Sequence, residues 1–98
     1  MELIFEWDKS KAESNVRKHK VSFDEAATVF QDKRVVTFPD VSHSIEEERF
    51  ISVGLSSRGR VLLVVHTEEE FHENVIVIRI ISSRKATKLE RVTYEKGE

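Results

Sequence analysis

One segment near the carboxyl end, residues 75–94, restricts most strongly what this chain can fold into. Residues 75–81 are apolar except for Arg79, and such a run predicts a strand that is buried in a sheet on both faces. Side chains alternate across a strand, so Arg79 shares a face with Val77, while Ile78 and Ile80 occupy the other. An isolated guanidinium costs several kcal/mol to remove from water. The face of Arg79 must therefore either supply a carboxylate or admit water or a ligand.

The same segment changes character after residue 81. Ser82 and Ser83 interrupt the strand pattern, and residues 84–94 follow a basic helical pattern. This pattern predicts that Arg84 and Lys85 lie in the first turn of a helix, where backbone N–H groups point outward and can receive an anion. Two cations at that end of a helix oppose its dipole, and a bound phosphate would resolve the conflict.

The rest of the chain predicts one α+β domain over residues 1–98. Alternating apolar residues indicate a short opening strand at 2–7, and a helix is expected over about 9–18. Ser22 and Glu25 fit a capping box at the start of a second helix. Four strands with mostly hairpin-length connections are expected next, at 35–38, 49–55, 60–67 and 75–81. The order β-α-α-β-β-β-β-α predicts a mainly antiparallel sheet with its helices packed on one face.

Composition argues against several classes of protein. The chain has no cysteine, so a disulfide scaffold is impossible and a cytoplasmic setting is favoured. No apolar run approaches the roughly 20 residues of a membrane span, and the first residues lack the pattern of a secretory signal. We therefore expect a cytoplasmic domain that does not enter a membrane.

Charge is distributed unevenly, although the net charge is only −2. Residues 9–20 hold five basic residues and one acidic residue, a net +4, and residues 79–91 hold the same balance. Acidic residues gather instead at 46–48 and 68–73. If the two basic segments meet in space, they form a positive surface suited to phosphate groups. The alternative is that both are ordinary solvated surfaces.

Short motifs along nearly the whole chain carry a resemblance to a known family. They are F-E-W-D at 5–8, N-V-R-K-H at 15–19, S-F-D-E-A with V-F at 22–30, D-V-S-H-S with E-E-R-F at 40–50, G-L-S-S-R-G-R at 54–60, and R-I-I-S-S-R-K-A-T with E-R and Tyr at 79–94. With these motifs the chain resembles the BrnT-type toxins of type II toxin-antitoxin pairs. It departs from their pattern at Lys20, where a glycine is usual, and in a longer loop at 68–74.

The resemblance implies a RelE-like fold and RNA cleavage that inhibits translation. It also implies neutralisation by a cognate BrnA-like antitoxin in a hetero-oligomer, which binds operator DNA through the antitoxin. Two functions are therefore weighed. The first is a metal-independent endoribonuclease toxin without a cofactor, and the alternative is a catalytically inactive RNA- or protein-binding module with the same fold.

RNA cleavage without a metal needs a base, a cation for the developing phosphorane charge, and an acid. Arginine suits the second role because its planar fork binds phosphate oxygens bidentately and keeps its charge. Arg79 and Arg84 are the candidates, and we expect them to converge with Arg60. Structural salt bridges are the alternative for each. A metal site is not expected, because the nearest candidate ligands lack a persuasive spacing: His66, His72 and Glu73.

Proton transfer falls to residues that titrate near neutral pH. His19 and His43 are the candidates for acid or base, and each is expected in a loop, where a surface hydrogen-bonding role is the alternative. Glu48 is a third candidate base, with a cross-strand ion pair as its alternative. The residues expected to bind nucleic acid without taking part in the chemistry are Lys18, Arg58, Arg60 and Lys85.

Overall fold

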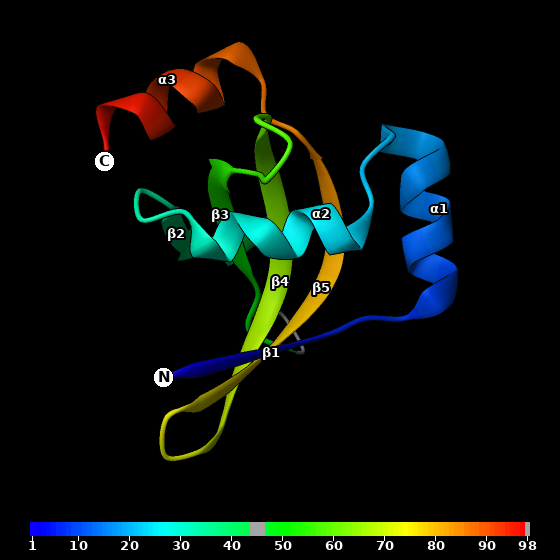
Figure 1. The fold of residues 1–98 in the computed structure, drawn as a ribbon, viewed down its shortest axis with the longest axis vertical. Helices are drawn as coiled ribbons and strands as arrows, with labels where there is room; N and C mark the ends of the chain where they lie inside the picture. The colour runs from blue at the N-terminus through cyan, green and yellow to red at the C-terminus, as the bar shows by residue number, and fades with distance from the viewer. Residues whose placement is uncertain (44–46, 98) are drawn as a thin grey trace.

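The computed structural model describes residues 1–43 and 47–97, and Figure 1 shows its strands and helices in chain order. Its elements are β1 (Glu2–Glu6), α1 (Lys9–His19), α2 (Phe23–Thr28), the 3₁₀ turn η1 (Val29–Gln31), β2 (Val36–Pro39), the 3₁₀ turn η2 (Val41–His43), β3 (Phe50–Leu55), β4 (Val61–His72), β5 (Val75–Lys85) and α3 (Lys88–Lys96). The expected order of strands and helices is confirmed. Within the described residues, no helix is long and apolar enough to cross a membrane.

The strands form one five-stranded sheet in the order β1-β5-β4-β3-β2. β1 runs parallel to β5, and every other neighbouring pair is antiparallel. The expected α+β fold with a mainly antiparallel sheet is thus confirmed. The long β4–β5 hairpin occupies the centre, and one parallel partner, β1, covers only the first half of β5.

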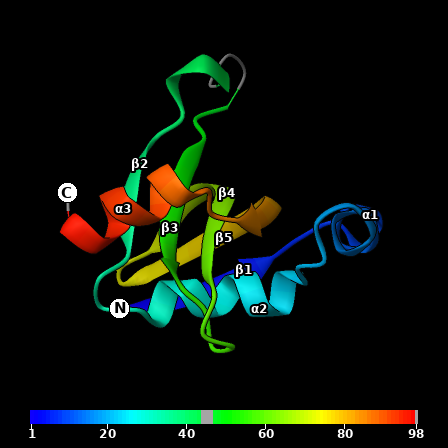
Figure 2. The same ribbon diagram turned by 90° about the horizontal axis from the view of Figure 1, so that it is seen from above.

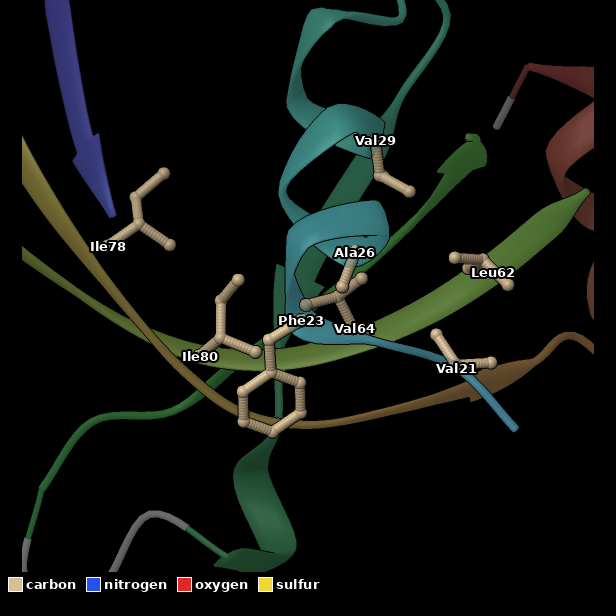
Figure 3. Packing of buried hydrophobic residues seen from close by; sticks show 8 residues of the cluster. All are labelled: Val21, Phe23, Ala26, Val29, Leu62, Val64, Ile78 and Ile80. Atoms are coloured by element: carbon tan, nitrogen blue, oxygen red, sulfur yellow. The ribbon is translucent and has the colours of Figure 1, made fainter. Parts of the chain in front are cut away.

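The main core lies between one face of the sheet and the helix α2, with α1 beside it. Figure 3 shows this cluster, in which Phe23 and Ala26 of α2 pack near Val64 and Ile80 of the sheet. Each of these four side chains is at most 1% exposed. Burial of this apolar surface is the main force that holds α2 on the sheet.

The expectation that all helices cover one face holds for α1 and α2 but is wrong for α3. Figure 2 shows α2 and α3 on opposite sides of the sheet. Tyr94 of α3 packs with Val53 and Leu63, which point away from the main core. β3 and β4 carry apolar residues on both faces at this end of the sheet, so a second helix is needed to cover the other face.

β5 does not break at Ser82 and Ser83 but continues to Lys85, so the expected break is wrong. The buried side chain of Asn15 explains why the strand continues. Its Nδ2 donates to the carbonyl oxygen of Ser83 at 2.8 Å, and its Oδ1 accepts from the Ser83 N–H at 3.0 Å. Asn15 therefore takes the place of a neighbouring strand where β1 has ended. As a result, Arg84 and Lys85 are strand residues rather than helical ones.

The predicted capping box at the start of α2 is confirmed only in part. Ser22 Oγ accepts from the Glu25 N–H at 3.0 Å, but the Glu25 side chain turns to other partners, so only half of the capping box forms. Lys20 ends α1 with φ 60°, in the left-handed region that favours glycine. This backbone conformation explains why the BrnT-type pattern has a glycine at the position that Lys20 occupies in this chain.

Candidate functional site

The sheet face opposite the main core is covered by α3 only at one end, and the remainder is open. Ile4 of β1 and Phe38 of β2 are 43% and 41% exposed there. Arg79 lies on this open face, while Ile78 and Ile80 are buried in the core on the other. The predicted division of the two faces of this strand is confirmed.

Arg79 has both a carboxylate partner and contact with water. It stands opposite Glu6 in the parallel β1–β5 register, and its Nη1 lies 3.6 Å from Glu6 Oε1. The two side chains are 44% and 55% exposed. An ion pair this exposed contributes at most about 1 kcal/mol, because water screens it. A phosphate group could therefore replace Glu6 at little cost.

Arg84 is held much more firmly. Its Nη1 and Nη2 donate to the two oxygens of Glu90 at 2.9 and 3.0 Å. This hydrogen-bonded pair raises the pKa of Arg84 and lowers the pKa of Glu90. Glu90 also accepts from the Thr87 N–H at 2.8 Å and so completes the capping box of α3. Arg84 thus fixes the first turn of α3 to β5.

Arg60 is bound to a third carboxylate. Its Nε donates to Glu25 Oε2 at 3.0 Å, and its Nη2 donates to Glu25 Oε1. The Glu25 side chain is only 4% exposed, and the hydrogen bond from Arg60 is the largest reason why its pKa is lowered. Arg79, Arg84 and Arg60 therefore contact carboxylates on β1, α3 and α2. The structure does not bring them together as expected.

His43 is positioned by a residue that the sequence analysis did not single out. Its Nδ1 lies 3.1 Å from Oδ2 of Asp40, whose side chain is mostly buried, while His43 itself is 67% exposed. A carboxylate at Nδ1 orients the ring and leaves Nε2 free to exchange a proton with a ligand. The D-x-x-H spacing, which places both residues on one helical turn, was the signal that could have found Asp40.

Arg49 is the second residue that the sequence analysis missed. Phe50 pairs with His66, and Thr67 pairs with Arg79. Continued by one residue, this register places Arg49 level with Thr67, on the open face. On the other side of β3, the hydrogen bond from the Asp40 N–H to the Arg49 carbonyl oxygen, 2.8 Å long, continues the β2–β3 pairing to Arg49 and so keeps the chain extended there. Only strand register could have revealed that Arg49 and Arg79 share a face.

The other two proposed acid–base residues lie elsewhere. His19 ends α1, and its exposed side chain has no hydrogen bond or ion pair with any residue that the structure describes. Figure 2 shows α1 well apart from β2, and His43 lies in η2 directly after β2. Glu48 is exposed, and its charge is the second cause, after burial, that raises the pKa of Glu68. Glu48 therefore lies near another carboxylate, and in the part of the chain that the structure describes it forms no ion pair with an arginine.

The residues proposed to bind nucleic acid fall into two places. Lys18 lies beside His19 at the end of α1. Arg58 is 73% exposed, with Nη1 4.0 Å from Glu25 Oε1. Arg60 and Lys85 line one pocket near the start of α3. The two basic segments do meet, because Asn15 Nδ2 donates to the Ser83 carbonyl oxygen at 2.8 Å. Arg60, which lies outside both segments, donates from Nη2 to the Lys20 carbonyl oxygen at 3.2 Å.

A buried histidine, His66, lies on the core face of the sheet and is not suited to hold a metal. His66 is fully buried, and its Nε2 lies 2.7 Å from Ser52 Oγ. Burial lowers the pKa of His66 to about 4. Glu68 Oε2 is 3.7 Å from its Nδ1. Among the described residues, no three His, Cys, Asp or Glu side chains gather as a metal site would require.

Comparisons with known proteins agree with this architecture. The family model described as "Ribonuclease toxin, BrnT, of type II toxin-antitoxin system" matches residues 7–90. Among solved structures, the crystal structure of the Brucella abortus ribonuclease toxin BrnT is similar, with a TM-score of 0.63 and 19% sequence identity over 90% of this chain and 100% of that one. At this identity the likeness establishes a shared fold. No curated protein sequence matches the chain significantly.

Proposed function

Because the chain belongs to the BrnT family of ribonuclease toxins of type II toxin-antitoxin systems, we propose that it is an endoribonuclease that cleaves RNA and inhibits translation. The observation that carries the proposal is the family match over residues 7–90. The open sheet face supports it, since this face presents a weakly held guanidinium to solvent. Because the proposed target is RNA used in translation, we propose that the protein acts in the cytoplasm.

We assign the stabilisation of charge to the open face and the proton transfer to His43 of η2, the turn that follows β2. Arg79 is proposed to stabilise the charge that develops on the phosphorane, because it can exchange the exposed Glu6 for a phosphate. His43, oriented by Asp40, is proposed to transfer a proton through Nε2. Arg49 is a second candidate cation on the same face, and Glu48 and His19 are the lesser candidates for acid or base. Arg84 is proposed to act indirectly, by fixing α3.

Cleavage is proposed to proceed without a metal or other cofactor, since an oriented histidine and arginines can supply proton transfer and charge stabilisation. Purified protein should cut RNA equally well in EDTA and in magnesium. Loss of cleavage in EDTA that magnesium or manganese restores, with the folding of the RNA controlled for, would contradict this.

The partner is proposed to be a BrnA-like antitoxin that forms a hetero-oligomer with this chain and carries the complex to operator DNA. Its contact segment should be acidic or amphipathic, because the two basic segments, 9–20 and 79–91, meet on this protein. Hydrogen exchange of the complex should show protection in both segments. Equal exposure in the free and bound protein would exclude direct occlusion.

One observation favours the alternative of an inactive binding module. Arg79, Arg84 and Arg60 each contact a carboxylate, which is what purely structural arginines do. Expression of the chain alone, and then with the neighbouring small reading frame, separates the two functions. We expect growth arrest and its rescue. Soluble protein that binds RNA without cutting it and leaves growth unchanged would establish the inactive module.

A further inference from the structure

We propose that a second basic site, where β4 begins and β5 ends, binds a backbone phosphate of RNA away from the bond that is cut. The inference rests on the proposed RNA substrate and concerns where the RNA is held rather than how it is cleaved. A site of this kind would position the RNA strand while residues elsewhere on the protein carry out the cleavage.

The site is a pocket of about 300 Å³ that three separate parts of the chain build. Figure 1 shows the β3–β4 connection and the start of α3 at the same end of the sheet. Three of the lining residues are cations, and among the described lining residues there is no carboxylate. The lining consists of Gly59, Arg60, Val61, Lys85, Ala86 and Arg91.

Arg60 is oriented in advance by the buried carboxylate of Glu25. Its Nε and Nη2 are occupied by Glu25 and by the Lys20 carbonyl oxygen. Nη1 has no hydrogen bond in the described part of the chain, so both of its N–H groups remain for a ligand. A guanidinium fixed in this way loses little conformational entropy when it binds a phosphate oxygen.

Lys85 and Arg91 supply positive charge that no carboxylate within the described residues balances. Both are exposed, and neither side chain has a hydrogen bond or ion pair with any residue that the structure describes. Their positions are nevertheless fixed by the backbone. The Ala86 N–H donates to the Val61 carbonyl oxygen at 3.0 Å, which fastens the β5–α3 connection against the start of β4.

The arrangement fits a phosphate better than it fits an acidic peptide. A backbone phosphodiester presents two non-bridging oxygens on a tetrahedral centre, and each accepts more than one hydrogen bond, so a guanidinium, an ammonium and a second guanidinium can bind it together. A carboxylate also has two oxygens, but in an acidic peptide each carboxylate ends a flexible side chain whose ordering costs conformational entropy, whereas the phosphates belong to the RNA backbone itself. An acidic segment of the antitoxin is therefore the rival occupant.

Binding of an uncleavable 2′-O-methyl RNA oligonucleotide, followed by fluorescence anisotropy, tests the site. Arg91→Ala and Lys85→Ala should each weaken binding about five- to tenfold and reduce the slope of log affinity against log salt by about 0.7, the value for one phosphate contact on a single strand. Lys88→Ala, a cation on α3 that does not line the pocket, is the matched control. It should change affinity by less than about twofold. Arg60 is left intact because its loss would unbalance Glu25.

The outcomes separate this site from the proposed function. Wild-type protein that neither binds nor cleaves RNA overturns the proposed function and this inference with it. Wild-type protein that cleaves RNA while Arg91→Ala and Lys85→Ala bind like Lys88→Ala overturns only the phosphate site. The phosphate site is also overturned if the two variants bind RNA normally and lose affinity only for the antitoxin.

Discussion

The two halves of β5 carry the same kind of residue in different surroundings. The first half, residues 75–79, pairs with β1, and its Arg79 meets an exposed carboxylate through one contact of 3.6 Å. The second half, residues 82–85, pairs on that edge with no strand of the described residues. There Asn15 binds Ser83, and Arg84 is held bidentately by Glu90.

The junction of the halves is irregular. The pairing of β4 with β5 shifts register between Val65 and His66, and the buried His66 stands opposite Ile80 at this shift. Position along one strand therefore decides whether an arginine is held by a carboxylate or stays accessible to a ligand. In the second half of β5, where Asn15 bonds to the strand edge and α3 lies nearby, Arg84 serves to hold α3 to the sheet. Where the edge is a neighbouring strand and the face is open, Arg79 remains accessible to a ligand.

The largest effect is expected from Asn15→Ala. This substitution removes the side chain that hydrogen-bonds to Ser83 along the edge of β5. Its loss leaves the Ser83 N–H and carbonyl and the Val21 carbonyl without their bonds to this side chain. We expect the free energy of unfolding to fall by about 3 to 4 kcal/mol, because each buried unsatisfied group costs about 1 to 3 kcal/mol and water can reach some of them. Urea denaturation measures it.

Glu13→Ala, at an exposed position of the same helix, is the matched control and should change the free energy of unfolding by less than about 0.5 kcal/mol. If Asn15→Ala were as stable as Glu13→Ala, the second half of β5 would not depend on this side chain.

The next largest effect is expected at the junction, where His66 should make the free energy of unfolding depend on pH. Burial lowers the pKa of His66 to about 4, so the folded protein binds fewer protons than the unfolded chain between pH 6.5 and 4. The contribution of neutral His66 to the free energy of unfolding is full above about pH 6.5. It decreases as the pH falls from 6.5 and is lost once the pH has fallen through 4. The loss should reach about 3 kcal/mol, since one pKa unit corresponds to about 1.4 kcal/mol.

Unfolding free energies of wild type and His66→Gln at pH 7 and pH 4 measure this difference. The lowered pKa values of Glu25 and Glu90 affect both proteins, so they cancel to first order. Glu68 lies 3.7 Å from His66 Nδ1, so Glu68→Gln is introduced into both proteins before the comparison. Equal losses in the two proteins would show that His66 is not the group that takes up the proton.

Arg79→Ala sharpens the comparison in the first half. Cleavage should fall about a hundredfold, the scale for losing one preorganised charge-stabilising group. Stability should change by less than about 1 kcal/mol, because the pair with Glu6 is screened by water. Steady-state cleavage and thermal unfolding of the same preparation measure both. A folded variant with wild-type cleavage would remove Arg79 from the chemistry.

The smallest effect is expected from Arg84→Ala in the second half. We expect a loss of stability of about 1 kcal/mol, since the pair is bidentate but partly exposed, and increased hydrogen exchange in the first turn of α3. Arg84→Lys should restore only part of it, because an ammonium cannot bind both oxygens of Glu90 in parallel. Wild-type exchange in Arg84→Ala would show that other contacts hold α3.

Patterns within a few residues of one another were predictable from the sequence. The alternation around Arg79, the Ser22 cap and the run of strands were all confirmed, because each depends on local geometry and on which side chains can leave water. The fold class followed from the order of these elements. The end of β5 was not predictable, because Asn15 and Ser83 are 68 residues apart and meet only in the folded protein.

The sequence by itself determined which residues could carry charge or exchange a proton, namely its arginines, histidines and carboxylates. Tertiary structure alone decided which carboxylate each arginine meets, and so which guanidinium is held and which is exposed. It also placed α3 on the second face and brought Arg60, Lys85 and Arg91 around one pocket. The physical reason is that an ion pair depends on distance and burial in space, and neither quantity is written in the spacing of residues along a chain.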